Sequence, residues 1–137
     1  MTSMHTEPEH ILVVEDDKDL RESLCEALRF EGYQVICAEH GEAALRHLST
    51  GAKPCVILLD LMMPVMDGWA FCRSRWRSQT LRQIPVILIS AVDLSETNHP
   101  TGIDAFLRKP IDPEGFAALA ARMAGRRSHV RPTGFIH

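Results

Sequence analysis

Residues 55–60 read CVILLD, and this stretch decides the fold. Five apolar residues run directly into an acid, Asp60, as expected of a strand that is buried on both faces and ends at a polar edge. The same pattern occurs earlier, where ILVV at 11–14 is followed by Glu15, Asp16 and Asp17. Because uninterrupted apolar strands are typical of parallel sheets covered by helices, the two stretches predict an α/β fold.

The rest of the chain alternates strand patterns with helical ones. Further strands are expected at 33–38, at 86–89 ending in Ser90, and at 105–107. Apolar residues recur at helical spacing between these strands, and Pro113 stands in the first turn of the last helix. The apolar helix faces contain Leu20, Leu24, Ala27 and Leu28; Ala44, Leu45 and Leu48; Trp69, Cys72 and Trp76; and Phe116, Leu119, Ala120 and Met123.

Strands that alternate with helices imply right-handed crossovers and a parallel sheet covered on both faces. Five strands in a chain of 137 residues favour the flavodoxin-like doubly wound order 2-1-3-4-5. Ligands of such sheets bind beyond the carboxyl ends of the strands, at the switch point between strands one and three. We therefore expect Glu15, Asp16 and Asp60 to converge there, joined by Ser90 and Lys109 from the next strands.

The composition is that of an ordinary globular domain. Hydrophobic residues make up 45% and charged residues 24%, and a formal net charge of -3 is too small to attract nucleic acid by itself. No stretch approaches the ~18 apolar residues of a membrane helix, and residues 1–10 have no apolar core resembling a signal peptide. We expect a cytoplasmic chain with a flexible segment at 1–9, a single domain at 10–125 and a flexible tail at 126–137.

Four cysteines, Cys25, Cys37, Cys55 and Cys72, stand in apolar surroundings without CxxC spacing. Such spacing supports neither a metal site nor a disulfide framework. We expect four buried free thiols.

Three carboxylates held within a few ångströms repel one another unless they share a cation. Mg²⁺ fits this set, because it prefers oxygen ligands and is commonly held by one or two carboxylates with a substrate phosphate. Asp16 would bind it directly, Glu15 through water, and Asp60 through one oxygen while the other attacks phosphorus. Lys109 would neutralise the incoming phosphoryl group, and the Ser90 hydroxyl would donate to another of its oxygens. The product would be an acyl phosphate.

Taken together, these stretches resemble response-regulator receiver domains of two-component signalling. The resemblance covers roughly residues 10–125. It rests on Glu15-Asp16 after the first strand, DLMMPVMDG at 60–68, Ser90-Ala91 and FLRKP at 106–110. Each motif alone is weak, and their order along five predicted strands makes the set specific.

The resemblance implies that Asp60 accepts a phosphoryl group from a histidine kinase or a histidine phosphotransfer protein, with Mg²⁺ as cofactor. Glu15 and Asp16 would bind the metal, and Met62 would contribute its backbone carbonyl. Ser90 and Lys109 would contact the phosphate.

The same resemblance makes Phe106 the aromatic residue that turns when the Ser90 hydroxyl moves toward the phosphate, and it implies a cis peptide between Lys109 and Pro110. A phosphoacceptor of this kind is a signalling domain rather than an enzyme. It would act in trans as a monomer or weak homodimer, by contact with a protein target and not with nucleic acid or membrane.

One segment departs from the family. The interval from Ser90 to Lys109 is 109 − 90 = 19 positions, about three fewer than is usual there. The segment 93–102 has Leu94 as its one large apolar residue, and Pro100 and Gly102 oppose a helix. We expect a short or distorted fourth helix.

Two other functions are compatible with parts of the pattern. A haloacid-dehalogenase-type phosphatase also uses an aspartyl nucleophile and Mg²⁺, but its DxD motif follows the first strand, whereas here Asp17-Lys18-Asp19 follows an acidic pair. The other is an interaction module of the receiver type that works without phosphorylation. The complete set of acids, serine and lysine argues against it.

Overall fold

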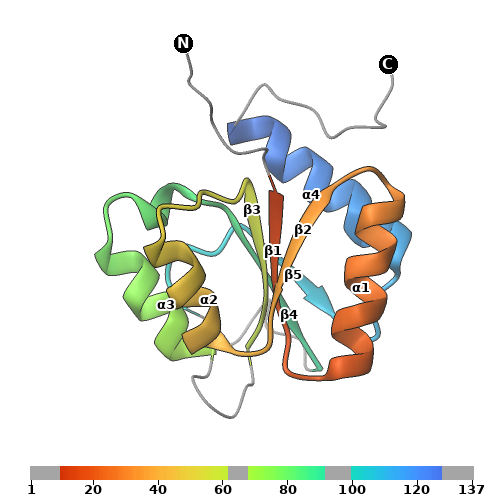
Figure 1. Ribbon diagram of the computed structural model, residues 1–137, viewed down its shortest axis with the longest axis horizontal. Helices are drawn as coiled ribbons and strands as arrows, with labels where there is room; N and C mark the ends of the chain where they lie inside the picture. The colour runs from red at the N-terminus through yellow and green to blue at the C-terminus, as the bar shows by residue number, and fades with distance from the viewer. Residues whose placement is uncertain (1–9, 62–67, 92–99, 128–137) are drawn as a thin grey trace.

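The computed structural model describes residues 10–61, 68–91 and 100–127. Five parallel strands form one sheet in the order β2-β1-β3-β4-β5, with helices on both faces (Figure 1). The predicted fold class and strand order are confirmed. The strands are β1 (His10–Val14), β2 (Gln34–Ala38), β3 (Val56–Asp60), β4 (Val86–Ser90) and β5 (Ala105–Arg108). The helices are α1 (Lys18–Phe30), α2 (Gly41–Ser49), α3 (Gly68–Arg77), the short 3-10 turn η1 (Leu81–Gln83) and α4 (Pro113–Arg127).

The apolar run of β3 serves two cores, one on each face of the sheet. Val56 and Leu58 pack into the cluster that also contains the buried faces of α1 and α4. Ile57 and Leu59 point the opposite way, into the cluster with α2 and α3. Because side chains alternate across a strand, a central strand covered on both sides needs an apolar residue at every position. This is the physical reason for the continuous pattern in the sequence.

The register of the strands brings their carboxyl ends together. Val14 is level with Leu59, Asp60 with Ile89, and Ser90 with Arg108. Glu15 follows β1 and Lys109 follows β5, so both stand at the same edge as the last residues of β3 and β4. The sheet therefore places the predicted polar residues on one rim.

Some expectations fall on residues outside the described ranges. Residues 92–99, which include most of the predicted distorted helix, are among them, and residues 100–102 end in a turn where Gly102 has φ +82°. Helix α4 ends at Arg127. The domain boundary at 125 stays a prediction, and the terminal segments 1–9 and 128–137 lie outside the described ranges. Within residues 10–61, 68–91 and 100–127, each helix is too short or too polar to cross a bilayer.

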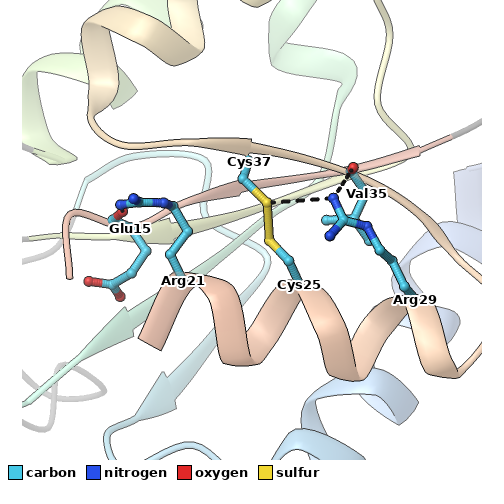
Figure 2. Close-up of a disulfide and its surroundings, with 6 residues drawn as sticks. All are labelled: Glu15, Arg21, Cys25, Arg29, Val35 and Cys37. Carbon is cyan, nitrogen blue, oxygen red and sulfur yellow. Dashed lines mark hydrogen bonds between the residues drawn. A yellow bond between two sulfur atoms is a disulfide. The ribbon is translucent and has the colours of Figure 1, made fainter. Parts of the chain in front are cut away.

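The expectation of four free thiols was wrong for two of the cysteines. Cys25 of α1 and Cys37 of β2 form a disulfide, with their Cα atoms 7.0 Å apart (Figure 2). The other two, half-buried Cys55 and buried Cys72, keep their thiols outside the disulfide, and the Cys55 thiol donates to the His10 carbonyl (3.4 Å). Spacing in the sequence could not reveal the pair, because the turn after α1 brings together two residues 12 positions apart.

A buried arginine joins helix α3 to the segments that precede β4 and β5. Arg75 of α3 is 1% exposed. Its guanidinium donates to the carbonyl of Ile84 (2.6 and 3.2 Å), to that of Arg82 (3.2 Å) and to that of Gly102 (3.3 Å). These carbonyls lie in segments without regular strand pairing, so one side chain satisfies acceptors that would otherwise be buried without partners.

We predict that Arg75→Met destabilises the protein by about 3 kcal/mol, because the apolar stem is kept while three carbonyls lose a charged donor. Urea unfolding followed by circular dichroism measures the difference. Arg77→Met, two residues further along the same helix at an exposed position, is the matched control and should change stability by less than about 0.5 kcal/mol. Equal effects of the two substitutions would contradict this role of Arg75.

Candidate functional site

Three carboxylates meet at the rim of the sheet, where β1 and β3 end. Oxygens of Glu15, Asp16 and Asp60 all lie within 4.8 Å of one another. Glu15 and Asp60 are buried and Asp16 is exposed, so the cluster opens to solvent on one side. The structure thus brings together the three acids that the sequence singled out.

The backbone of the acidic pair is held from two directions. The Glu15 N–H donates to the carbonyl of Ala38 at the end of β2 (3.1 Å). From α1, the Arg21 guanidinium donates to the carbonyls of Glu15 (2.8 Å) and Asp16 (3.4 Å). Asp17 caps α1 by accepting from the Leu20 N–H (3.1 Å). The turn between β1 and α1 is therefore fixed at each of its residues.

Asp17 thus has a structural role at the start of a helix. Its side chain is committed to the cap, and its N–H donates to the Glu15 carboxylate (3.1 Å). The DxD-like sequence at 17–19 belongs to this cap and to the first turn of α1. A phosphatase nucleophile at this point finds no support.

Lys109 supplies a positive charge to the cluster. Its Nζ lies 3.3 Å from Asp60 Oδ2 and 3.5 Å from Glu15 Oε1. Burial would lower the pKa of Lys109, but the charges of Asp60 and Glu15 outweigh it and raise the pKa above its ordinary value. The ammonium group therefore stays protonated across the physiological range and faces two carboxylates.

Burial raises the pKa of Glu15 to about 8, and the neighbouring carboxylate of Asp60 adds to this effect. The N–H of Asp17 and the charge of Lys109 lower the pKa of Glu15, but by less than burial and Asp60 raise it. With protein groups alone, Glu15 thus retains a proton at neutral pH. If all three acids were ionised, the single ammonium of Lys109 would not neutralise them.

The residues present fit a divalent cation. Glu15 Oε1 is buried, and among the described residues it accepts no hydrogen bond. The Lys109 Nζ, 3.5 Å away, forms an ion pair with this oxygen but no hydrogen bond, so a closer cation or a proton would stabilise it. An all-oxygen set of this size, open on one side, matches the preference of Mg²⁺ for carboxylates, water and phosphate.

Ser90 lies on β4, the strand next to the one that ends in Asp60, and Phe106 lies on β5, one strand further along the sheet. Ser90 is buried at the end of β4, and its carbonyl accepts from the Lys109 N–H (2.7 Å). Phe106 of β5 is half-buried, is level with Leu88 and packs against the α2/α3 core. The predicted cis peptide between Lys109 and Pro110 is present. Met62 lies outside the described residues.

Gly68 closes the loop that follows Asp60. Its N–H donates to the Leu61 carbonyl (2.7 Å), and a Cβ there would stand 2.5 Å from the Leu61 Cα. Any larger residue would push the backbone next to Asp60 out of place. This explains why the loop ends in glycine.

Comparison with known proteins agrees with this geometry. The sheet order and the acidic cluster at its switch point define a flavodoxin-like doubly wound domain. The profile of the response regulator receiver domain matches residues 11–121. The chain therefore belongs to the response regulator receiver domain family of two-component signalling, whose members are phosphoacceptor signalling domains that partner with histidine kinases or phosphotransfer proteins.

Individual relatives are similar over most of this chain. The response regulator MprA of Mycolicibacterium vanbaalenii is 41% identical over 120 residues, which are 85% of this chain and 49% of the relative. The chain thus spans about half the length of the curated relatives it matches.

Solved structures of receiver domains share its fold at lower sequence identity. The Francisella response regulator 1452 receiver domain has a TM-score of 0.77 at 28% identity and covers 89% of this chain and 100% of its own. The receiver domain of the sensor histidine kinase PA1611 from Pseudomonas aeruginosa has a TM-score of 0.78 at 27% identity, over 87% of this chain and 99% of its own. That structure holds a magnesium ion in its active site cleft.

Sequence reasoning missed two residues that position the site. Arg21 gave no signal, because a single arginine on an amphipathic helix is usually solvated. Gly68 ends the motif at 60–68, but its close approach to Leu61 depends on contacts that no local pattern encodes. In both cases the sequence does not show which distant residue is contacted in the folded chain.

We predict that wild-type stability falls as pH rises from about 5 to about 8. The pKa of Glu15 in the folded chain, about 8, lies above its ordinary value of 4.5. In that window the unfolded chain has released a proton that the folded chain still binds, so raising the pH favours unfolding. Glu15→Gln should remove this loss and be more stable by about 1 to 3 kcal/mol near pH 8 without divalent cations.

Urea unfolding in EDTA at both pH values measures the effect. The matched control is Glu22→Gln at an exposed position of α1, which should keep the wild-type pH dependence. A Glu15→Gln variant with an unchanged pH dependence would show that this carboxyl is not the group that titrates.

Proposed function

We propose that this chain accepts a phosphoryl group onto Asp60 from a histidine kinase or a histidine phosphotransfer protein. The observation that carries the proposal is the Asp60 carboxylate placed 3.3 Å from the Lys109 ammonium within the three-acid cluster. A carboxylate that is already ionised needs no general base to act as a nucleophile. It needs its own charge and that of the incoming phosphoryl group to be compensated.

In the proposed reaction, an Asp60 carboxylate oxygen forms a bond to phosphorus as the phosphorus–nitrogen bond of the donor phosphohistidine breaks. The electron pair of that bond leaves with the imidazole, which takes up a proton. Lys109 moves from the carboxylate pair toward the equatorial phosphoryl oxygens, where negative charge has to be stabilised. The product is an acyl phosphate on Asp60.

Glu15, Asp16 and Asp60 would hold Mg²⁺, with the backbone carbonyl of Met62 as a further ligand. When bound, the ion neutralises negative charge between the acids and the phosphoryl oxygens. The buried Glu15 carboxyl would give up its proton on binding, because a nearby divalent cation favours the charged form of a carboxyl even when water lies between them. The acid pair is pre-positioned for this by Arg21 and by the Ala38 carbonyl.

Ser90 and Phe106 would convert the phosphorylation into a change of shape. The Ser90 hydroxyl would donate to a phosphoryl oxygen, and the half-buried Phe106 ring would move into the space it leaves. Output would be a change in the surface near β5 and α4 that a protein target reads. We propose that this signalling takes place in the cytoplasm, in trans and through protein–protein contacts.

Mg²⁺ should stabilise the folded chain, because a ligand of the native state shifts the unfolding equilibrium by mass action. At about 100 times its Kd the gain is about 2.7 kcal/mol, measured as a rise in the unfolding midpoint over an EDTA control. Asp16→Asn should lose most of this gain. Asp17→Asn is the matched control, since asparagine caps a helix as well as aspartate does and leaves the three acids intact. Equal Mg²⁺ stabilisation of the two variants would contradict the assignment.

Incubation with acetyl phosphate and Mg²⁺, followed by intact mass, tests the phosphoacceptor directly. Wild type should gain one phosphoryl group and Asp60→Asn none, because the amide is not a nucleophile of this kind. Asp19→Asn, the same chemical change at an exposed position of α1, should be phosphorylated as wild type is. A wild-type chain that gains nothing would favour an interaction module that works without phosphorylation.

A further inference from the structure

The Cys25–Cys37 disulfide ties the first helix to the edge strand of the sheet. Cys25 lies on the buried face of α1 and is 1% exposed, whereas Cys37 lies on β2 and is exposed. β2 has one neighbour in the sheet, β1, so this edge is held by one ladder, by packing and by the covalent link. An exposed disulfide is open to attack by thiols, which is typical of labile rather than permanent bridges.

Both cysteines are adjacent to the groups that hold the acidic pair. Cys37 is level with Val13, and the next residue on its strand, Ala38, accepts the Glu15 N–H. Cys25 follows Arg21 by one helical turn, and Arg21 donates to the Glu15 and Asp16 carbonyls. Figure 2 shows the Arg21 side chain extending to Glu15 beside the disulfide. Fixing the distance from α1 to β2 therefore fixes both supports of the acid backbone.

A third side chain of this helix face reaches the sulfur. Arg29, one turn beyond Cys25, donates to the Val35 carbonyl (3.1 Å) and lies with its Nη2 4.0 Å from Cys37 Sγ (Figure 2). A cation beside a cysteine stabilises its thiolate, which is the form that exchanges with disulfides. Once reduced, Cys37 would be the accessible, reactive thiol and Cys25 the buried one that resolves the exchange.

We propose that Cys25 and Cys37 are a redox-active pair that responds to low-molecular-weight disulfides and sets how firmly the acidic site is held. The Cys37 thiolate attacks one sulfur of a small disulfide and releases one thiol. The Cys25 thiolate then attacks Cys37 in the mixed disulfide and releases the second. Two electrons and two protons pass from the protein pair to the small disulfide, which becomes two thiols, and an excess of thiol reverses both steps.

Oxidation closes the link between α1 and β2 and holds Arg21 and Ala38 against the acid backbone. Reduction leaves the edge strand with its ladder, its packing and the Arg29–Val35 hydrogen bond but without the covalent link, so the turn after β1 opens more often. The effect on phosphorylation rests on the proposed function of Asp60, and the effect on the disulfide and on the backbone does not. The oxidised chain is the form with the better-ordered site.

Thiol trapping in glutathione buffers of different ratios, followed by intact mass after alkylation of the denatured chain, tests the pair itself. Because Cys55 and Cys72 take no part in the disulfide, wild type should take up two alkyl groups when oxidised and four when reduced, with a midpoint inside the series. Cys37→Ser should take up three alkyl groups at every glutathione ratio. Any thiol blocked as a mixed disulfide with glutathione is recovered by treatment with dithiothreitol. Four groups at every ratio, or two at every ratio, would overturn the proposal, because the pair would then be permanently open or permanently closed.

Hydrogen exchange of the Glu15 amide tests the coupling without any phosphoryl donor. We expect about fivefold slower exchange in the oxidised wild type, the lower end of ordinary coupling between sites. Cys37→Ser should exchange at the reduced rate in both buffers, and Cys55→Ser should behave as wild type does. Equal exchange in oxidised and reduced wild type would refute the coupling.

The acetyl phosphate reaction then measures the consequence, with about fivefold faster phosphorylation expected of the oxidised wild type. A chain that shows the redox change and the exchange difference but no phosphorylation would disprove the role of Asp60 and leave the redox pair standing. A phosphorylated chain with equal rates in both buffers would disprove the regulation alone.

Discussion

Mutual repulsion among Glu15, Asp16 and Asp60 is the constraint on which the rest of this structure depends. Three carboxylate oxygens within 4.8 Å of one another, two of them on buried residues, cost stability in a protein without bound cations. Lys109 relieves part of that cost, yet the buried Glu15 Oε1 accepts no hydrogen bond from the part of the chain that the structure describes. A divalent cation bound among the acids would relieve the rest of that cost.

The fold provides the rigidity that keeps these charges together. The strands that carry Glu15 and Asp60 are buried on both faces, so any movement of either acid would disturb two apolar cores. Where the chain leaves the sheet, arginine side chains donate to backbone carbonyls that have no strand partner. Arg21 binds the carbonyls after β1, and Arg75 binds those before β4 and β5. An arginine offers several donors in a fixed plane, which suits it to carbonyls that belong to no regular ladder.

The sequence predicted what depends on local pattern. The apolar runs ending at Glu15 and Asp60 indicated the central strands, and the rule that ligands bind at the switch point brought the acids, Ser90 and Lys109 to one edge. The sequence did not predict three contacts: the Cys25–Cys37 disulfide, the hydrogen bond from Arg21 to the Glu15 carbonyl, and the contact of Gly68 with Leu61. Each of these depends on the distance between two elements after packing, which spacing along the chain does not determine.

Helix α1 is the element where these constraints meet. Asp17, Arg21, Cys25 and Arg29 stand four residues apart along one helix face, and each contacts the turn after β1 or the edge strand β2. A row at this spacing shifts as one body when a helix slides or tilts. The contacts made by these four side chains are therefore not independent of one another. Arg21 lies one helical turn from Cys25 and donates to the Glu15 carbonyl. Opening or closing the disulfide can therefore affect the acidic pair directly through Arg21.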